Sequence, residues 1–351
     1  MRKKHFLFAS VLALLCGSSA LHAQDFKLTS SGYFKNQGVD IMAFDDIYPE
    51  GHQGGVCIIM NGHRVATNGD IRLEATPGQW QPVPKQLDRK LGDNSITATL
   101  CYPDSSRHLT GFNPMIYPDL HLIYTVNVES KGKNIEVTVD LDRPIPQEFI
   151  GKVGFNLEFF PGSLFGKPWI MDGQSGIFPQ QPNSPLMTTQ PNYLHTGNYH
   201  DGKQSLADMD KLIGKGYSPI VADDIISEPY AKGRKFTSRP DDPYNKVTIE
   251  SLSGDLQLFD GRMNHNNGWF VLRSNIKPGV TKGAVKWIIT PNVVADWMYQ
   301  PVIQTSQIGY HPAQDKEAVI EMDIRDNRKE TAQIIRIDAD GEKVVKNVTP
   351  A

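Results

Sequence analysis

The chain has 351 residues and a formal net charge of −3, which is length enough for two domains without a strongly acidic or basic balance. No run of Lys and Arg stands out, so the sequence gives no sign of nucleic-acid binding. It contains 30 glycines and 24 prolines and almost no helical periodicity, which favours an all-β fold.

The first segment, Met1–Ala23, has the features of a secretory signal peptide. Three basic residues precede an apolar run of about ten residues, which is shorter than the roughly 20 that a membrane helix needs. We therefore expect export to the periplasm, the cell surface or the medium, and a mature chain with a formal charge of −6. A lipid anchor at Cys16 stays open, although its flanking residues make a poor attachment box. No later stretch is apolar enough to span a bilayer.

Strand signals recur through most of the mature chain as short apolar or alternating runs bounded by turn residues. In chain order they are Val56–Met60, Asp70–Ala75, Ser95–Tyr102, His121–Val128, Asn134–Leu141, Lys152–Phe160, Val247–Leu252, Leu256–Phe259, Gly268–Arg273 and Ala284–Thr290. Turns are predicted at Asn61-Gly62, Asn68-Gly69 and Asp260-Gly261. The sequence therefore predicts a large antiparallel β-sandwich with long loops over residues 24–299.

Two cysteines remain in the mature chain, Cys57 and Cys101, and both lie in apolar strand-like runs. An oxidising compartment would permit a disulfide between them. The simpler interpretation is two buried thiols that pack as small apolar groups. Neither has a second Cys or His at zinc-ligand spacing.

A long connection from Phe178 to Tyr230 is rich in Pro, Asn, Gln, Gly and Asp. Ser205 and Asp208 form a capping-box pattern before apolar residues near helical spacing, which predicts one short helix. Connections of this length in a compact domain are usually functional or mobile at the surface.

Two aromatic clusters contain candidate carbohydrate-binding residues. The first combines Trp169 with Asp172 and Gln174, because a sugar ring stacks on an exposed aromatic face while polar side chains bond its hydroxyls. The second combines Trp269 with polar neighbours, namely Asp260, Arg262 and His265. In both clusters the favoured alternative is structural: aromatics anchoring loops to the core, an Asn-Gly turn, and Arg262 paired with a local acid.

Paired acids for catalysis are not evident. Adjacent pairs at Asp45-Asp46, Asp223-Asp224 and Asp241-Asp242 point to opposite faces of an extended chain, so none is a predicted catalytic pair. No cofactor is expected, and a calcium ion held by such a loop is the one alternative left open. The chain also lacks a nucleophile elbow and a phosphate-binding glycine loop.

The C-terminal segment Pro301–Asp323 reads PVIQTSQIGYHPAQDKEAVIEMD. It resembles the opening of the immunoglobulin-like module that precedes the catalytic barrel in family 9 glycoside hydrolases. Residues 300–351 offer four strand candidates, Val302–Ser306, Ala318–Ile324, Ala332–Asp338 and Lys343–Asn347. An immunoglobulin-like sandwich has about seven strands, so we expect this module to be incomplete.

The N-terminal region also resembles the extension of Bacteroides-type family 9 enzymes, for example in GFNPMIYPDL, GKPWIMD and DGRMNHNNGWF. The resemblance implies a parent enzyme that cleaves β-1,4-glucan or xyloglucan. The aspartate motif of the family's barrel is absent, and Asp338-Ala339-Asp340-Gly341 is predicted to be a hairpin turn. We therefore carry over no catalytic residue.

Three functions are compatible with these observations. The leading one is a non-catalytic portion of a secreted β-glucan hydrolase that positions the catalytic barrel, its expected partner. The second is a carbohydrate-binding module in its own right, with β-glucan or xyloglucan as ligand. The third is a hydrolase with its own site in the sandwich, in the Phe178–Tyr230 connection.

Overall fold

The computed structural model describes residues 25–45, 54–74, 77, 84–102, 120–181, 187–189, 225–263, 268–328 and 330–350. The predicted signal peptide and the helix predicted near Ser205 lie outside these residues. Within them the chain is an all-β sandwich built from two nine-stranded antiparallel sheets, and the only helical elements are three short 3-10 turns. These turns are Gln147–Phe149, Pro161–Ser163 and Gly261–Met263.

The first sheet runs in the spatial order β1-β2-β3-β4-β5-β10-β19-β18-β15. Its strands are β1 (Lys27–Leu28), β2 (Phe34–Asn36), β3 (Val39–Ala43), β4 (Val56–Met60), β5 (His63–Leu73), β10 (Val153–Phe159), β15 (Ala231–Gly233), β18 (Leu256–Asp260) and β19 (Phe270–Asn275).

The second sheet runs in the order β12-β11-β16-β17-β20-β9-β8-β7-β6. Its strands are β6 (Lys85–Leu91), β7 (Ser95–Tyr102), β8 (Leu122–Lys131), β9 (Asn134–Leu141), β11 (Pro168–Met171), β12 (Gln174–Ile177), β16 (Lys235–Ser238), β17 (Val247–Ser251) and β20 (Val285–Pro291). A separate two-stranded sheet joins β13 (Met187–Thr189) to β14 (Ile225–Ser227).

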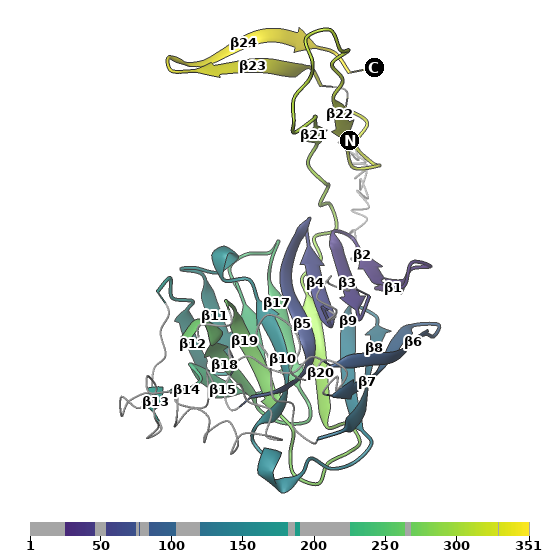
Figure 1. Cartoon of the computed structure of the whole chain (residues 1–351), viewed down its shortest axis with the longest axis vertical. Coiled ribbons are helices and arrows are strands. Elements are labelled where there is room, and N and C mark those ends of the chain that lie inside the picture. The colour runs from purple at the N-terminus through teal and green to yellow at the C-terminus, as the bar shows by residue number, and fades with distance from the viewer. Residues whose placement is uncertain are drawn as a thin grey trace, which may run out of the picture.

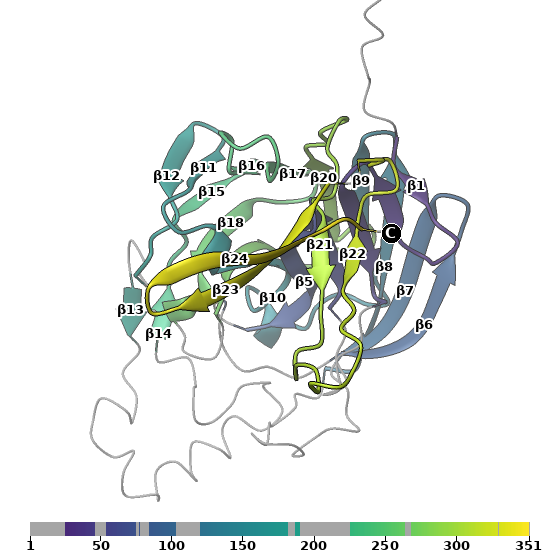
Figure 2. The ribbon, with the colours of Figure 1, turned by 90° about the horizontal axis from the view of Figure 1, so that it is seen from above.

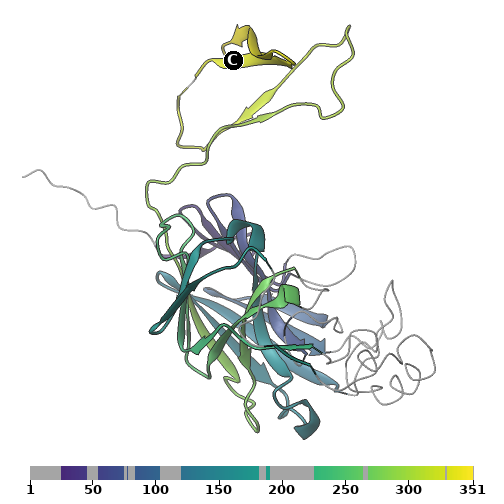
Figure 3. The ribbon, with the colours of Figure 1, turned by 90° about the vertical axis from the view of Figure 1, so that its left-hand side faces the viewer.

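The core lies between the two large sheets, which Figure 3 shows as two layers. Phe155 of β10 meets Trp287 of β20 edge-on with ring centroids 5.0 Å apart, and Phe159 meets Phe236 of β16 at 5.8 Å. The indole nitrogen of Trp287 donates to the Ser274 hydroxyl of the opposite sheet at 3.0 Å. Alternating strands such as β9 supply this core, because every second residue faces inward.

Two of the predicted turns have different outcomes. Asn61 and Gly62 both have positive φ and join β4 to β5, as a two-residue hairpin requires. The turn predicted at Asn68-Gly69 is wrong, because β5 continues through it from His63 to Leu73. The pairing of β5 with both neighbours shifts register at this point, so the pair forms a bulge within the strand.

Cys57 on β4 and Cys101 on β7 form no disulfide with each other. Cys57 is buried and its sulfur lies 3.2 Å from the carbonyl oxygen of Gly54 and 3.0 Å from the Thr67 hydroxyl. Cys101 is half-buried. The structure therefore agrees with the thiol interpretation and not with a disulfide.

The C-terminal segment forms two separate hairpins beyond one end of the sandwich (Figures 1 and 2). One joins β21 (Val302–Gln304) to β22 (Val319–Glu321), and the other joins β23 (Ala332–Asp338) to β24 (Gly341–Val348). Asp338 pairs with Gly341 across a tight turn, which confirms the hairpin predicted there. After β20 ends at Pro291, a linker without strands leads to β21.

Candidate functional site

Trp169 lies in β11 between β12 and β16 and is only 6% exposed. Its ring packs on the backbone of Gly176, where a Cβ atom would come within 2.5 Å of the ring. A stacking platform needs an exposed ring face, and Trp169 offers none. The burial of Trp169 therefore favours the structural alternative, in which the ring anchors the edge of the core.

Asp172 and Gln174 hold the chain where it passes from one sheet to the other. The Asp172 carboxylate accepts hydrogen bonds from the backbone nitrogens of Arg234 at 2.8 Å and Lys235 at 3.0 Å. The Gln174 side chain donates to the carbonyl oxygen of Lys232 at 2.8 Å. Both predicted ligand-binding side chains thus have structural partners.

Asp260 and Arg262 form the local ion pair that the structural alternative predicts. The Arg262 guanidinium donates to both carboxylate oxygens of buried Asp260 at 2.8 Å. It lies over the Phe270 ring, 4.5 Å from the centroid, and donates to the carbonyl oxygen of Pro179 at 2.8 Å. Arg262 therefore ties the segment after β12 to the end of β18.

Trp269 is half-buried and meets Phe160 edge-on, with ring centroids 4.5 Å apart. Of the two predicted tryptophans it is the more exposed. His265 lies outside the described residues. The two predicted groups share one end of the sandwich, because Gln174 bonds to β15 and β15 pairs with β18, the strand that ends at Asp260.

A second polar group, which no sequence motif indicated, crosses the middle of the first sheet. We call it the charge cluster. It comprises side chains from β5 and its end, from β10 and from β19, all buried: Asp70, Arg72, Glu74, Asn156, Glu158 and Arg273.

Strand register places Asn156 and Arg273 on one face. Asn156 lies opposite Asp70 on one side and Arg273 on the other, and partners directly opposite each other in antiparallel strands share a face. The alternate residues Phe155 and Phe159 pack against the second sheet. Asn156 and Arg273 therefore lie on the opposite face of the first sheet from Phe155. The Asp70 carboxylate, in contrast, contacts Tyr124 of β8 in the second sheet.

In one half of the charge cluster, Arg273 donates hydrogen bonds to several neighbours. Its guanidinium donates to Glu74 at 3.1 Å, to the side-chain oxygen of Asn156 at 3.0 Å and to the carbonyl oxygen of Lys152 at 2.8 Å. The Asn156 amide in turn donates to Glu74 at 2.5 Å. Gly154 makes room for the guanidinium, since a Cβ there would lie 2.8 Å from Nε of Arg273.

Asp70 belongs to the other half. It accepts hydrogen bonds from the Tyr124 hydroxyl at 2.8 Å and the Ile71 nitrogen at 2.7 Å, and an Arg72 nitrogen lies 3.7 Å away. Burial raises the pKa of Asp70 to about 6, against the opposing effect of Arg72. Burial also raises the pKa of Glu74, which Arg273 counteracts.

Tyr102 of β7 contacts the backbone at the end of β5, near Asp70. Its hydroxyl accepts a hydrogen bond from the backbone nitrogen of Leu73 at 3.2 Å, and burial raises its pKa. Burial alone would lower the pKa of Arg72. The carboxylates of Glu158 and Asp70 have the larger opposite effect and raise the pKa, so the guanidinium stays charged.

Each carboxylate of the charge cluster has a donor. Glu74 has Arg273 and Asn156, Asp70 has Tyr124, and Glu158 accepts from the Asn68 amide at 2.5 Å. This geometry stabilises three adjacent strands and buries one acid, Asp70, whose pKa burial raises to about 6. It differs from two carboxyl groups that face each other across open space, as glycoside hydrolysis requires.

The charge cluster has only a weak signature in the sequence. Asp70, Arg72 and Glu74 alternate with apolar residues, which is also typical of a solvent-exposed strand face. Their role depends on the pairing of β5 with β10 and of β10 with β19, and β19 is far away in the sequence. The one local sign was charge on alternate positions of several apolar strands.

No group of three or more His, Cys, Asp or Glu side chains that could hold a metal ion forms among the residues that the structure describes. Two of the acids considered for calcium have basic partners: Asp242 pairs with Arg239, and Asp45 lies 3.7 Å from Arg89. Three others lie outside the described residues, namely Asp46, Asp223 and Asp224. In the same part of the chain, no helix is long and apolar enough to cross a membrane.

Comparison with known proteins gives structural likeness only. No family model matches the chain, and no curated protein is similar to it in sequence. A solved protein from Synechocystis is 10% identical with a TM-score of 0.31, covering 76% of this chain and 96% of its own. A galactose mutarotase-like protein from Lactobacillus casei is 10% identical with a TM-score of 0.33, covering 76% and 98%. Values this low establish neither family nor function, and the family 9 resemblance stays a prediction.

Proposed function

We propose that this chain is a non-catalytic portion of an exported family 9 glycoside hydrolase acting on β-1,4-glucan or xyloglucan, where it positions the catalytic barrel. The observation that carries the proposal is the apolar surface of the two C-terminal hairpins. The sequence of Pro301–Asp323, with its resemblance to the module before such barrels, supplies the link to this family.

The hairpins expose apolar side chains that normally lie in a core. Ile337 is 76% exposed and Val344 is 53% exposed. We call this surface the hairpin face. It is made by the exposed apolar residues on the strands of the hairpins, on both sides of each hairpin. These are Val302, Ile303, Val319, Ile334, Ile335, Ile337, Val344, Val345 and Val348.

An isolated two-stranded hairpin is marginally stable in water and gains stability when an apolar face is covered. Burial contributes about 25 cal/mol for each Å² of apolar surface. A partner with an apolar docking surface would therefore stabilise the hairpins as it binds them. A catalytic barrel held at this end of the sandwich fits that requirement.

The polar groups of the sandwich support a non-catalytic role. Asp172, Asp260 and Glu74 are each engaged by hydrogen-bond donors of the chain itself. Such acids are used for pairing between strands rather than for a reaction across an open site.

The docking experiment uses a family 9 endoglucanase barrel without its N-terminal modules as the probe. We expect it to bind the full chain, and the double substitution Ile335→Lys and Val344→Lys to weaken binding at least about tenfold. These two residues lie directly opposite each other in β23 and β24.

The matched control is Leu87→Lys, which places the same charge on an apolar side chain of β6 that is 50% exposed. It should leave barrel binding unchanged. If the barrel does not bind the unmodified chain, or binds the double variant equally well, the hairpin face is not its docking surface.

A second candidate function is a hydrolase with its own site in the sandwich. The observation that favours it is Asp70, whose raised pKa is typical of a general acid. Turnover of xyloglucan by the purified chain, lost on Asp70→Asn, would establish it.

A further inference from the structure

A cleft lies where the chain leaves the sandwich, and neither predicted cluster nor the charge cluster contributes to it. Its volume is about 920 Å³. One wall is formed by the first strands of the first sheet, and the other by residues 295–299 of the linker and the segment that follows β22. Clefts of about 300–1,000 Å³ are typical of small-ligand sites.

The floor of the cleft is a row of side chains across four strands. Lys27 pairs with Lys35, Lys35 with Asp40, and Asp40 with Ile59. Directly opposite residues share a face, so this row presents two ammonium groups, a carboxylate and an apolar group along one line. All four residues line the cleft.

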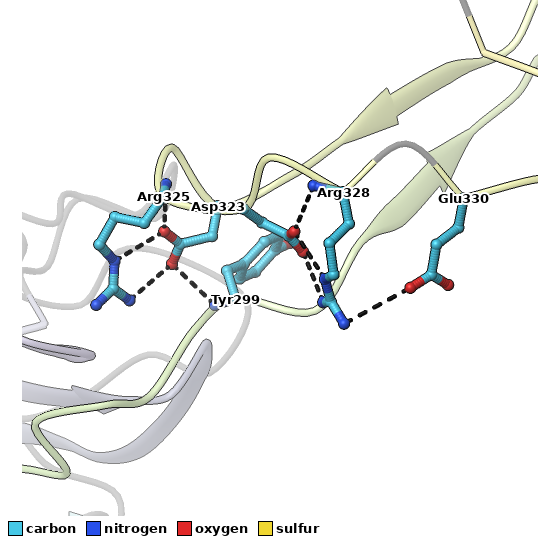
Figure 4. Close-up of polar contacts among 6 residues, drawn as sticks. Tyr299, Asp323, Arg325, Arg328 and Glu330 are labelled. Carbon is cyan, nitrogen blue, oxygen red and sulfur yellow. Dashed lines mark hydrogen bonds and ion pairs between the residues drawn. The ribbon is translucent and has the colours of Figure 1, made fainter.

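The opposite wall is held in place by hydrogen bonds. The Gln37 amide donates to the carbonyl oxygen of Trp297 at 2.7 Å, and Arg325 donates to the same oxygen. Figure 4 shows Asp323 accepting from the backbone nitrogen of Tyr299 at 3.0 Å and from Arg325. The hydrogen bonds from Arg325 lower the pKa of Asp323, which therefore stays ionised. The cleft is thus preformed.

Two aromatic rings of this wall rest on glycine turns of the sandwich. The Trp297 ring lies against Gly38, where a Cβ would come within 2.7 Å, and Gly38 has a φ of +65° that favours glycine. The Tyr299 ring lies beside Gly62. The two rings are 6.4 Å apart at 74° and both residues keep part of their surface exposed.

Asp40 lines the cleft and keeps part of its surface exposed. Its Oδ1 atom is buried and has no hydrogen-bond partner. Burial raises the pKa of Asp40, and Lys35 opposes the rise. Because Asp40 is only half-buried, a hydroxyl of a ligand in the cleft can donate to its carboxylate.

The charge of the lining selects against ionic ligands. Four carboxylic acids and three basic side chains line the cleft and nearly cancel. A phosphate or a polyanion would meet too many carboxylates, and a cation would meet the lysines. A neutral ligand with many hydroxyls can instead donate to carboxylates, accept from ammonium groups and stack on aromatic rings.

We propose that this cleft binds a short segment of a neutral glycan chain, with Asp40 and Lys27 bonding its hydroxyls and Tyr299 contacting a sugar face. The choice of a β-1,4-glucan as the glycan rests on the proposed function. The site would hold substrate chain next to the barrel that the hairpin face positions.

The experiment is calorimetric titration of the full chain with cellotetraose, a xyloglucan oligosaccharide, xylotetraose and mannotetraose. We expect binding of the first two. Asp40→Ala and Tyr299→Ala should each weaken it at least about tenfold. Lys27→Met, on the short edge strand β1, tests the site without disturbing the linker. The control Asp88→Ala removes an acid from β6, in the other sheet, and should change nothing.

The outcomes separate this site from the proposed function. Binding of xylotetraose or mannotetraose alone, with the same sensitivity to the substitutions, keeps the cleft as a glycan site and overturns the β-glucan assignment. No binding of any of the four, or binding that all three substitutions leave intact, overturns the cleft. The barrel-docking experiment is independent of either result.

Discussion

Asp70 is a carboxyl group that burial holds at a pKa of about 6, where an unfolded chain would titrate near 3.8. The folded state therefore binds more protons than the unfolded state between about pH 4 and pH 6. Ionisation of Asp70 then lowers stability as the pH rises through this window, by on the order of 3 kcal/mol. Arg72 and Tyr124 stabilise the ionised carboxylate of Asp70 and so limit this loss of stability.

We predict that Asp70→Asn removes this titration. The free energy of unfolding of the unmodified chain minus that of the variant should fall between about pH 4 and pH 6, since only the unmodified chain loses stability there. Urea unfolding of both proteins across this range measures it.

Asp140 is the matched control because its pKa is shifted the other way. Burial raises the pKa of Asp140, but hydrogen bonds from Gly283 and Lys282 outweigh burial and lower it. Its contribution is present at higher pH and is lost as the pH falls through the folded pKa. The difference between the unmodified chain and Asp140→Asn should therefore rise with pH. The same sign for both variants would contradict the assignment to Asp70.

Residue types alone did not distinguish anchoring from binding side chains. Trp169 and Arg262 occur in sequence segments rich in Gly and polar residues, a composition that suits a sugar site and a structural anchor equally. What decides between them is the neighbour in space, Gly176 beneath Trp169 and Asp260 beside Arg262. Those neighbours follow from strand pairing, so the sequence could only leave both alternatives open.

At the scale of elements, strict alternation was the dependable signal. Asn134–Leu141 and Ser95–Tyr102 are strands with the predicted bounds, because both combine period-two alternation with a buried face. The strand β11 was missed because it has only four residues and begins with a proline. The strand β12 was missed because Ile177 is its only large apolar residue. The edge strand β6 was missed because all of its residues are exposed or half-exposed and most of them are charged.

The C-terminal hairpins differ from the sandwich in how their strands are covered. All eight residues of β24 are exposed, whereas every second residue of β9 is buried and β9 lies between β20 and β8. Local opening of β23 and β24 should therefore cost little free energy compared with global unfolding.

Hydrogen exchange measures this difference. We predict that backbone amides of β23 and β24 exchange at least about a hundredfold faster than those of β9 in the isolated chain, and slow down when a family 9 barrel is bound. Equal protection of β24 and β9 in the isolated chain would mean that the hairpin face is already covered, for example by a second copy, and sedimentation would then show a dimer.

For the whole molecule, the arrangement of acids bears on whether the chain can break a glycosidic bond. Hydrolysis needs a proton donor and a second carboxylate about 5–9.5 Å apart across the scissile bond, with room for the sugar between them. In the charge cluster Arg273 and Asn156 occupy the donor positions around Glu74, and Asn68 bonds to Glu158. A sugar would have to displace these partners to reach the acids.

We therefore predict that the purified chain does not hydrolyse carboxymethyl-cellulose or xyloglucan, although its cleft binds short neutral glycans. Release of reducing ends is the measurement, with Asp70→Asn and Glu74→Gln prepared in the same way. A trace contaminant would give equal activity in all three preparations. Activity in the unmodified chain that either substitution abolishes, while the variant remains folded, would instead make the charge cluster an active site. The accessory role would then be wrong, because the chain would carry its own chemistry.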